Sequence, residues 1–327
     1  MRRCCIRGAF PFPLQPATSI RHFFGSPALS APIALNQSAA LRGMALGIAS
    51  YTLFAVHDAL VKSVILVLPV VQILFVRSVV IVAICLVIGR RQLVVDLVRS
   101  GNKPMLLLRA ILTLAAWCMY YSAGREMQLA EMTTLYYFAP VITIVLAVIF
   151  LKEQLTLARV GAAAIGFFGV LVASNPAGLT FGIPALLVLG AAFFWAVAMI
   201  LMRSISKSES SMVLIFSLNL FYTIAMGLLS IPLWTAMDPL QVLILVATGI
   251  VGGTAQYVLV EAARLVPASV LGTVEYFALI WSFVFGFLFW GEQPAGVVFV
   301  GAALVIVAGL VLAWSERRPR RPVVDAP

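Results

Sequence analysis

Four ionisable residues that could do chemistry lie inside long apolar segments of this sequence. Glu275 occurs in Val274-Glu275-Tyr276, His57 and Asp58 are adjacent, and Arg77 lies within a separate apolar run. If these segments cross a membrane, such groups are costly unless they face the protein interior, and there they usually contribute to function. We therefore expect Glu275 to contact a cationic substrate group or exchange a proton, with Arg77, Asp58 and His57 as its electrostatic partners.

Each of these residues also has a structural alternative. Glu275 could pair with a buried arginine or hydroxyl group. His57 and Asp58 could lie near the outer end of their helix and only cap it or pair with Lys62. Arg77 could hold an anionic group of a substrate, or it could form an internal ion pair with Asp58 or Glu275.

Aromatic and amide side chains form a second group of candidates in four of the predicted helices. Tyr and Trp at mid-depth could stack on a flat heterocycle while their polar atoms hydrogen-bond it. The alternative is ordinary packing or a belt at the membrane interface. The members are Trp117, Tyr120, Tyr121, Tyr136, Tyr137, Gln256, Tyr257 and Tyr276.

Four further kinds of residue have predicted structural roles. Pro140 should kink its helix and is a candidate hinge, in one half only because the matching residue is Leu279. Arg109 is expected to extend to the cytoplasmic surface. Glu153 and Glu292 are expected to be structural residues at the rim. Close helix packing is predicted at five glycines: Gly161, Gly166, Gly169, Gly301 and Gly309.

The elements that must position these residues are membrane-spanning helices. Of the 327 residues, 63% are hydrophobic and 10% charged, whereas a soluble domain has about a quarter charged residues. The mean hydropathy is +1.09. Uniformly apolar runs, rather than runs that alternate, favour helices over a transmembrane barrel. The predicted spans are 43–61, 69–89, 105–124, 131–151, 156–174, 183–203, 211–232, 240–260, 267–290 and 294–315.

The charge distribution predicts the orientation. The net charge of +10 comes from basic residues in the predicted loops and tails, almost all on one side of the membrane; only Lys62 and Arg125 fall on the other. The positive-inside rule then places both termini in the cytoplasm of a multi-pass protein in the inner or plasma membrane. Nucleic acid is not an expected partner. Residues 1–41 are predicted to be a disordered cytoplasmic tail and 316–327 a basic cytoplasmic tail.

The sequence repeats itself after about 140 residues. Tyr137-Phe138-Ala139 recurs as Tyr276-Phe277-Ala278, and Glu153-Gln154 recurs as Glu292-Gln293 in the same register. A unit of five helices begins on one side of the membrane and ends on the other, so its second copy has the opposite orientation. Such inverted repeats favour alternating access at the interface between the halves. The predicted repeats are 42–174 and 182–315.

A family resemblance follows from these features. Ten helices in two halves, a Glu after the fourth helix of each half and the Gly-rich helix that follows it resemble the EamA branch of the drug/metabolite transporter superfamily. Among its members the chain is most similar to those described as riboflavin or S-adenosylmethionine importers. The resemblance implies that helices 1–4 and 6–9 surround a central cavity, whereas helices 5 and 10 pack at the periphery.

These observations predict a secondary transporter rather than an enzyme. Its substrate would be a small organic metabolite that is vitamin-, nucleoside- or amino-acid-like, moved by proton coupling or exchange. The chain has no Gly-x-x-x-x-Gly-Lys-Ser/Thr loop and no cluster with metal-ligand spacing, so we expect no cofactor and no metal. A metabolite or drug exporter and a passive channel remain alternatives, as does an intramembrane enzyme that would use His57, Asp58 and Glu275. A homodimer is possible.

Overall fold

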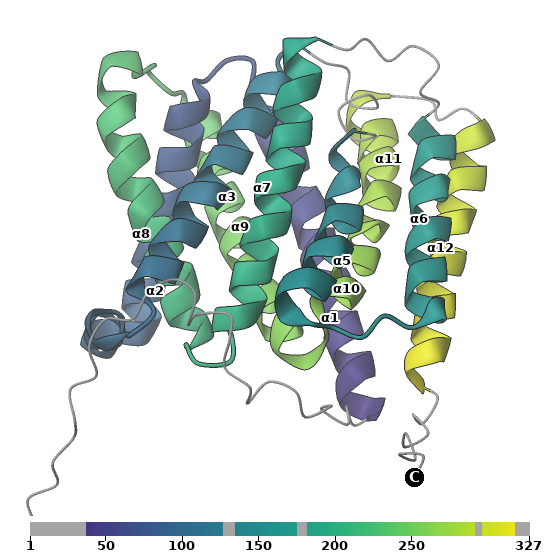
Figure 1. Ribbon diagram of the computed structural model, residues 1–327. Coiled ribbons are helices and arrows are strands. Elements are labelled where there is room, and N and C mark those ends of the chain that lie inside the picture. Colours follow the sequence, from purple (N-terminus) through teal and green to yellow (C-terminus); the bar gives the residue numbers. More distant parts are fainter. Residues whose placement is uncertain (1–36, 127–134, 175–181, 292–295, 318–327) are drawn as a thin grey trace, which may run out of the picture. The chain divides into compact units, whose positions relative to one another are not determined.

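The computed structural model describes residues 37–126, 135–174, 182–291 and 296–317, and every regular element in these ranges is helical (Figure 1). A short 3₁₀ helix, Ile231–Leu233, follows α8. The α-helices are α1 (Gln37–Lys62), α2 (Val70–Arg99), α3 (Lys103–Ala123), α5 (Phe138–Leu151), α6 (Leu157–Ser174), α7 (Ile183–Ile205), α8 (Ser211–Ser230), α9 (Pro239–Leu265), α10 (Ala268–Glu275), α11 (Phe277–Trp290) and α12 (Gly296–Arg317).

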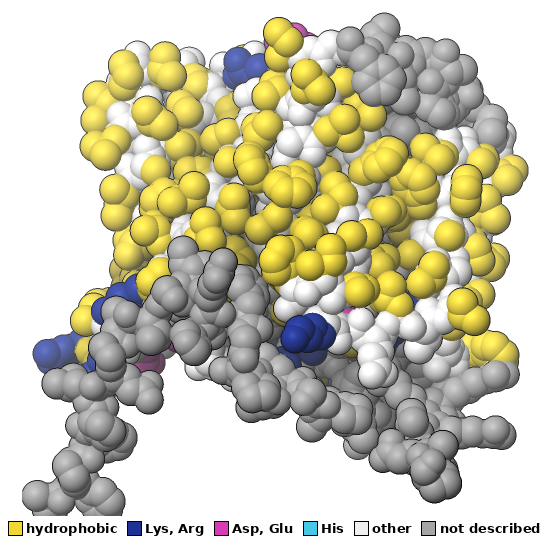
Figure 2. Space-filling view, in the orientation of Figure 1, with side chains coloured by type: hydrophobic (Ala, Val, Ile, Leu, Met, Phe, Trp, Pro, Cys, Tyr) yellow, Lys and Arg dark blue, Asp and Glu magenta, His cyan; other side chains and the backbone are white. Residues whose placement is uncertain are grey.

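The helices have the length and surface of an integral membrane protein. Within the described ranges, seven apolar segments are long enough to cross a bilayer, with α10 and α11 forming one of them, and three apolar helices are shorter. Large hydrophobic side chains such as Leu186, Leu243 and Phe289 are exposed around the bundle. Figure 2 shows hydrophobic side chains over the middle of the visible face, with Lys and Arg near its two ends. Lipid can cover such a surface, whereas water cannot without a large cost.

Several helices extend beyond their predicted limits, and α9, for example, continues to Leu265. α1 begins at Gln37, so residues 37–41 are helical, while residues 1–36 of the predicted tail lie outside the described part. α2 continues to Arg99 after a kink at Arg90, whose φ is 50° and ψ is −152°. The segment after this kink is helical, where the sequence predicted a loop, because it buries Leu93 against the bundle. α12 ends at Arg317, and the rest of the predicted basic tail also lies outside the described residues.

The fourth predicted span of each half is interrupted at matching positions. Tyr276 separates α10 from α11, and Tyr137 is a turn residue between helical residues 135–136 and α5. The two tyrosine rings are 5.7 Å apart. Both helices also end in a left-handed residue, at Lys152 (φ 51°) and Gly291 (φ 66°). The local backbone therefore repeats with the offset of the sequence repeat, and the interruption occurs in both halves although only the first contains Pro140.

The contacts between helices follow the same repeat, so that corresponding helices have corresponding neighbours. α1 packs on α9 and α11, and the corresponding helix α7 packs on α3 and α5. α2 packs on α8, its counterpart, and α6 on α12. These contacts join one half to the other, so the two halves form a single interlocked bundle. Figure 1 shows α6 and α12 side by side at one edge, the peripheral place that the resemblance implied.

Glu153 connects the two halves at the start of α10. Its carboxylate accepts hydrogen bonds from the backbone nitrogens of Ala268 (2.9 Å) and Ser269 (3.3 Å) and from the Ser269 hydroxyl (2.8 Å). A carboxylate here satisfies free N–H groups and complements the positive end of the helix dipole. Glu153 therefore has the structural role that its position indicated. Its counterpart Glu292 lies outside the described residues.

Glycines allow α6 to approach its neighbours closely. A Cβ at Gly169 would lie 2.8 Å from the carbonyl oxygen of Gly301 on α12. Gly166 leaves the same kind of room for Tyr276, and Gly309 for Phe277. The prediction is wrong for Gly161, because a Cβ there would meet no atom within 4 Å.

We predict that Gly169→Leu lowers the thermal stability of the purified protein in detergent, because the side chain cannot fit between α6 and α12. Overpacking of this kind costs about 1–3 kcal/mol. Gly161→Leu on the same helix is the matched control and should leave the melting temperature nearly unchanged. Equal melting temperatures for the two variants, measured by tryptophan fluorescence, would contradict this packing.

Candidate functional site

Arg77, His57 and Asp58 form a hydrogen-bonded chain between α1 and α2. Arg77 Nη1 lies 3.0 Å from His57 Nε2, and His57 Nδ1 lies 3.0 Å from Asp58 Oδ1. A guanidinium can only donate, so Nε2 must accept, and the proton of a neutral imidazole is then on Nδ1, where it can be donated to Asp58. The predicted direct ion pair of Arg77 with Asp58 or Glu275 is absent among the described residues, because His57 lies between Arg77 and Asp58.

This chain is held in place by packing on several sides. Arg77 is only 1% exposed, and its guanidinium carbon lies 4.9 Å from the centre of the Trp117 ring and 6.0 Å from that of Tyr222. On α9, Gly252 leaves room for the imidazole, since a Cβ there would lie 2.8 Å from His57 Cδ2. The ring of His57 is therefore fixed by α1, α2, α3 and α9 together. Asp58 is more open, with 43% of its side chain exposed.

Glu275 occupies a separate buried position beside the interruption between α10 and α11. The hydroxyl groups of Tyr51 and Tyr136 donate long hydrogen bonds to its carboxylate, at 3.4 and 3.5 Å. Tyr51 was not predicted from the sequence. It comes from α1 and Tyr136 from the segment before α5, so the carboxylate lies where the two halves meet. Discontinuous helices in other transporters also place binding groups at an interface between repeats.

Aromatic rings connect the position of Glu275 with that of Asp58. Tyr121 donates a 3.5 Å hydrogen bond to Asp58 Oδ1, and Tyr136 does the same for Glu275. Successive ring centres lie 4.9–6.2 Å apart, a normal range for aromatic contacts. The series runs Trp117, Tyr121, Tyr120, Tyr136, Tyr137, Tyr276. Six of the eight predicted aromatic and amide residues thus belong to one continuous wall.

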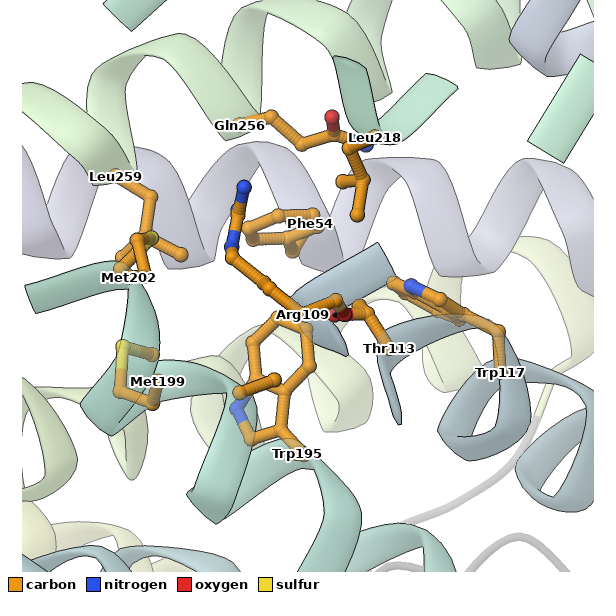
Figure 3. Close-up of a pocket in the computed structure, with 11 residues that line it drawn as sticks. Phe54, Arg109, Thr113, Trp117, Trp195, Met199, Met202, Leu218, Gln256 and Leu259 are labelled. Atoms are coloured by element: carbon orange, nitrogen blue, oxygen red, sulfur yellow. Dashed lines mark hydrogen bonds between the residues drawn. The ribbon is translucent and has the colours of Figure 1, made fainter. Parts of the chain in front are cut away.

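A pocket opens next to this wall, between α1, α3, α7, α8 and α9. Its aromatic sides are Phe54, Trp117 and Trp195, and its polar groups include Arg109 and Gln256 (Figure 3). Phe54 and Trp195 are at corresponding positions of the two halves, and their rings meet edge to face at 6.2 Å. The pocket is therefore lined by both repeats.

Gln256 and Tyr257 are adjacent in the sequence but face different surroundings. Gln256 lines the pocket, and its Oε1 accepts a 2.8 Å hydrogen bond from Asn219 on α8. Tyr257 is 42% exposed and lies outside the aromatic wall. Neighbouring positions on a helix differ by about 100°, so one of two adjacent side chains usually points away from the interior.

Arg109 does not extend to the surface, and the prediction that it does is wrong. It is 6% exposed, and its Nη1 donates a 3.1 Å hydrogen bond to the carbonyl oxygen of Leu214 on α8. Figure 3 shows its side chain stretching across the pocket. The sequence contains a signal for this position: Arg109, Thr113 and Trp117 recur every four residues, which places them on one face of α3, and all three line the pocket.

Comparisons with known proteins agree with this architecture. The profile of the EamA-like transporter family matches residues 41–175 and 182–314, the two predicted repeats. The chain belongs to the EamA-like transporter family. Its membership points to a transporter rather than an enzyme.

Curated relatives of this EamA-like protein are named as transporters. A riboflavin transporter of Vibrio cholerae is 28% identical over 53% of this chain and 59% of its own length. A pseudopaline exporter, CntI, of Pseudomonas aeruginosa is 28% identical over 83% of this chain and 95% of its own length. An S-adenosylmethionine uptake transporter of Rickettsia conorii is 25% identical over 55% of this chain and 61% of its own length. The matches to the riboflavin and S-adenosylmethionine transporters thus span about three fifths of those relatives.

A solved crystal structure shares the fold of this EamA-like protein. The two structures superpose with a TM-score of 0.71, at 21% sequence identity, over 87% of this chain and 99% of the other. At this identity the likeness concerns the fold alone.

The tautomer of His57 is directly testable, because the chain contains only one other histidine, His22. We predict that ¹⁵N-histidine NMR at neutral pH shows His57 as neutral, with Nδ1 protonated and Nε2 unprotonated. Arg77→Gln should abolish this strict preference for the Nδ1-protonated form. A guanidinium can only donate to Nε2, whereas the glutamine amide can donate or accept. The His22→Ala variant assigns the signals. A protonated Nε2 in the unaltered protein would contradict the hydrogen-bonded chain.

Proposed function

We propose that this protein is a secondary transporter that moves a small organic metabolite across the inner or plasma membrane by alternating access. The observation that carries the proposal is the meeting of the two halves around buried polar groups. Glu275, the interrupted helices and the aromatic wall all lie at this interface. A polar solute crossing a bilayer needs such an interior, because its polar groups would otherwise lose their hydrogen bonds in lipid.

The proposed topology has ten spans in two inverted repeats, with both termini in the cytoplasm. Seven long and three shorter apolar helices support this number. In Figure 1, α1 begins and α12 ends on the lower side, whereas α7 begins on the upper side, opposite to its counterpart α1. The predicted cytoplasmic loops with basic residues, such as that after α2, are also on the lower side. Association into a homodimer stays a prediction.

Alternating access requires parts of the bundle to tilt while the site stays intact. The interruptions at Tyr137 and Tyr276 are suitable points, since a break in the helical hydrogen bonds lets the two segments move separately. Pro140, the third residue of α5, is the proposed hinge residue of the first half. Because the interruptions lie at equivalent places, tilting at one and then the other would open opposite sides.

Coupling to protons or exchange of substrates would drive the movement. Glu275 is the proposed coupling residue because it is buried and the tyrosine hydroxyl groups that donate to its carboxylate do so over long distances, 3.4 and 3.5 Å. Such weak donors can stay in place whether the carboxyl group is charged or protonated, since a hydroxyl can both donate and accept. His57, Asp58 and Arg77 are proposed to keep the opposite part of the wall polar and ordered.

The proposed substrates are vitamin-, nucleoside- or amino-acid-like molecules. Flat ring systems could stack on Trp117, Tyr120, Tyr121, Tyr137 and Tyr276, while Gln256 hydrogen-bonds their polar edges. The relatives are named for transport of a vitamin and uptake of a nucleoside derivative, and one is named as an exporter. The direction of transport must therefore be measured separately. Purified protein should first be screened by thermal shift against riboflavin, S-adenosylmethionine, nucleosides and amino acids, because a ligand that binds the folded state raises its stability.

Transport of the compound found in this way is then measured in reconstituted vesicles. A carrier shows saturable counterflow, in which unlabelled substrate inside the vesicle accelerates entry of labelled substrate. A channel or passive facilitator shows flux that rises without saturation, and this result would contradict the proposal. Imposed pH gradients of either sign separate proton coupling from exchange, and vesicles of known orientation separate uptake from export.

We predict that Glu275→Gln lowers gradient-driven transport by about tenfold or more, the effect of losing an interaction worth roughly 1.4 kcal/mol. The variant keeps the shape of the side chain but cannot carry a charge. Asp96→Asn removes an exposed carboxylate from α2 and is the matched control, with transport expected to stay unchanged. Normal transport by Glu275→Gln at normal membrane abundance would exclude Glu275 from the coupling site.

A further inference from the structure

We propose that the pocket binds an oxyanion of the substrate, a carboxylate or a phosphate, and that Arg109 is the residue that binds it. This inference rests on the proposed transport function and specifies its substrate class. The substrate would be an organic acid with a planar or apolar body.

The position of Arg109 is the first observation. Its side chain is almost fully buried, extends across the pocket, and makes its hydrogen bond among the described residues from Nη1 to a backbone carbonyl. That bond leaves donors of the guanidinium without a protein acceptor in the described part of the chain. A buried cation without a carboxylate partner is costly, and an incoming oxyanion would remove this cost through paired hydrogen bonds.

The neighbouring charges increase the positive potential of the pocket. Arg77 lies over the ring of Trp117, which lines the pocket, and two of its nitrogens, Nε and Nη2, are buried without a hydrogen-bond partner among the described residues. Asp58 and Glu275 do not line the pocket, and tyrosine hydroxyl groups donate hydrogen bonds to both carboxylates. A low-dielectric cavity that contains one sign of charge attracts the opposite sign.

The aromatic lining of the pocket indicates what the non-anionic part of the substrate is like. Trp117 and Trp195 meet at 6.1 Å with their planes at 78°, and Phe54 closes the same wall. These surfaces favour a flat or apolar group. Gln256 is held by Asn219 and presents its amide near the same space, so it can bind one further polar edge. An anionic group at Arg109 and a ring against the tryptophans would use both features of the pocket together.

Charged cysteine reagents test the sign of the pocket without knowledge of the substrate. Met199 lines the pocket on α7, so Met199→Cys is introduced into the full chain after replacement of its native cysteines. The variant is treated in membranes with anionic MTSES and cationic MTSET, and each rate is divided by the rate with a free thiol in solution. We expect the normalised MTSES rate to exceed the MTSET rate by about tenfold, the lower end of electrostatic steering in a charged cleft.

The Arg109→Gln change should abolish this preference. Arg125→Gln is the matched control: Arg125 follows the opposite end of α3 and also donates to backbone carbonyls, of Ile65 and Leu68, but it does not line the pocket. A cation preference, equal normalised rates, or a preference that survives Arg109→Gln would overturn the anion site while leaving transport intact. Failure of both reagents to react would instead show that solutes do not reach the pocket, which contradicts the proposed function as well.

Protection experiments identify which anionic group the pocket binds and whether an aromatic ring binds with it. Phenylacetate, phenyl phosphate and phenylacetamide have the same ring and are added separately before MTSES. We expect one of the two anions to slow the modification of the Met199→Cys variant at least fivefold, with the amide having little effect, because only an anion can pair with the guanidinium. The more effective anion distinguishes a carboxylate from a phosphate site. Equal protection by the amide, or protection by none of the three, would overturn the combined aromatic and anionic pocket.

Discussion

Buried charge in a bundle surrounded by lipid is the constraint on which the rest of this structure depends. No water is available in the hydrocarbon region to solvate an unpaired ion, so each one must be held by other groups of the protein. His57 meets this requirement for two charges at once, because it accepts from Arg77 and donates to Asp58. Gly252 makes room for its ring and Trp117 covers the guanidinium, so residues of four helices contact this one hydrogen-bonded chain.

The second half of the site satisfies the same constraint in a different way. In the described part of the chain Glu275 forms no ion pair with a cation, and the hydroxyl groups of Tyr51 and Tyr136 donate hydrogen bonds to its carboxylate instead. Under the proposed function, this difference separates two roles. A charge fixed by strong hydrogen bonds can order the wall, whereas a carboxyl group held by weak, reversible donors can change its protonation state during a transport cycle.

The repeat explains why these groups meet at the interface. Helices of one half pack chiefly on helices of the other, and the interruptions at Tyr137 and Tyr276 bring two equivalent rings into contact. The chemistry placed on this frame is not symmetric: the counterparts of His57 and Asp58 are Ala198 and Met199. A symmetric frame can therefore provide two equivalent movements, while an asymmetric set of side chains selects what is bound.

The sequence by itself determined the helical membrane class, the approximate spans and the repeat. Hydropathy and repeated residues accumulate along the chain and need no knowledge of neighbouring helices. It also identified His57, Arg77 and Glu275 as buried polar groups, because an ionisable residue within an apolar run can be recognised from the linear sequence.

Only the tertiary structure decided how these groups are paired and which way each side chain faces. His57 between Arg77 and Asp58, Arg109 in the pocket rather than at the surface, and Tyr257 on the outside while Gln256 points inward all depend on the rotation of each helix about its axis. That rotation is set by close packing against helices that lie far away in the sequence, such as α9 against α1. Local sequence carries little information about it, since a turn of 100° separates an interior residue from its exposed neighbour.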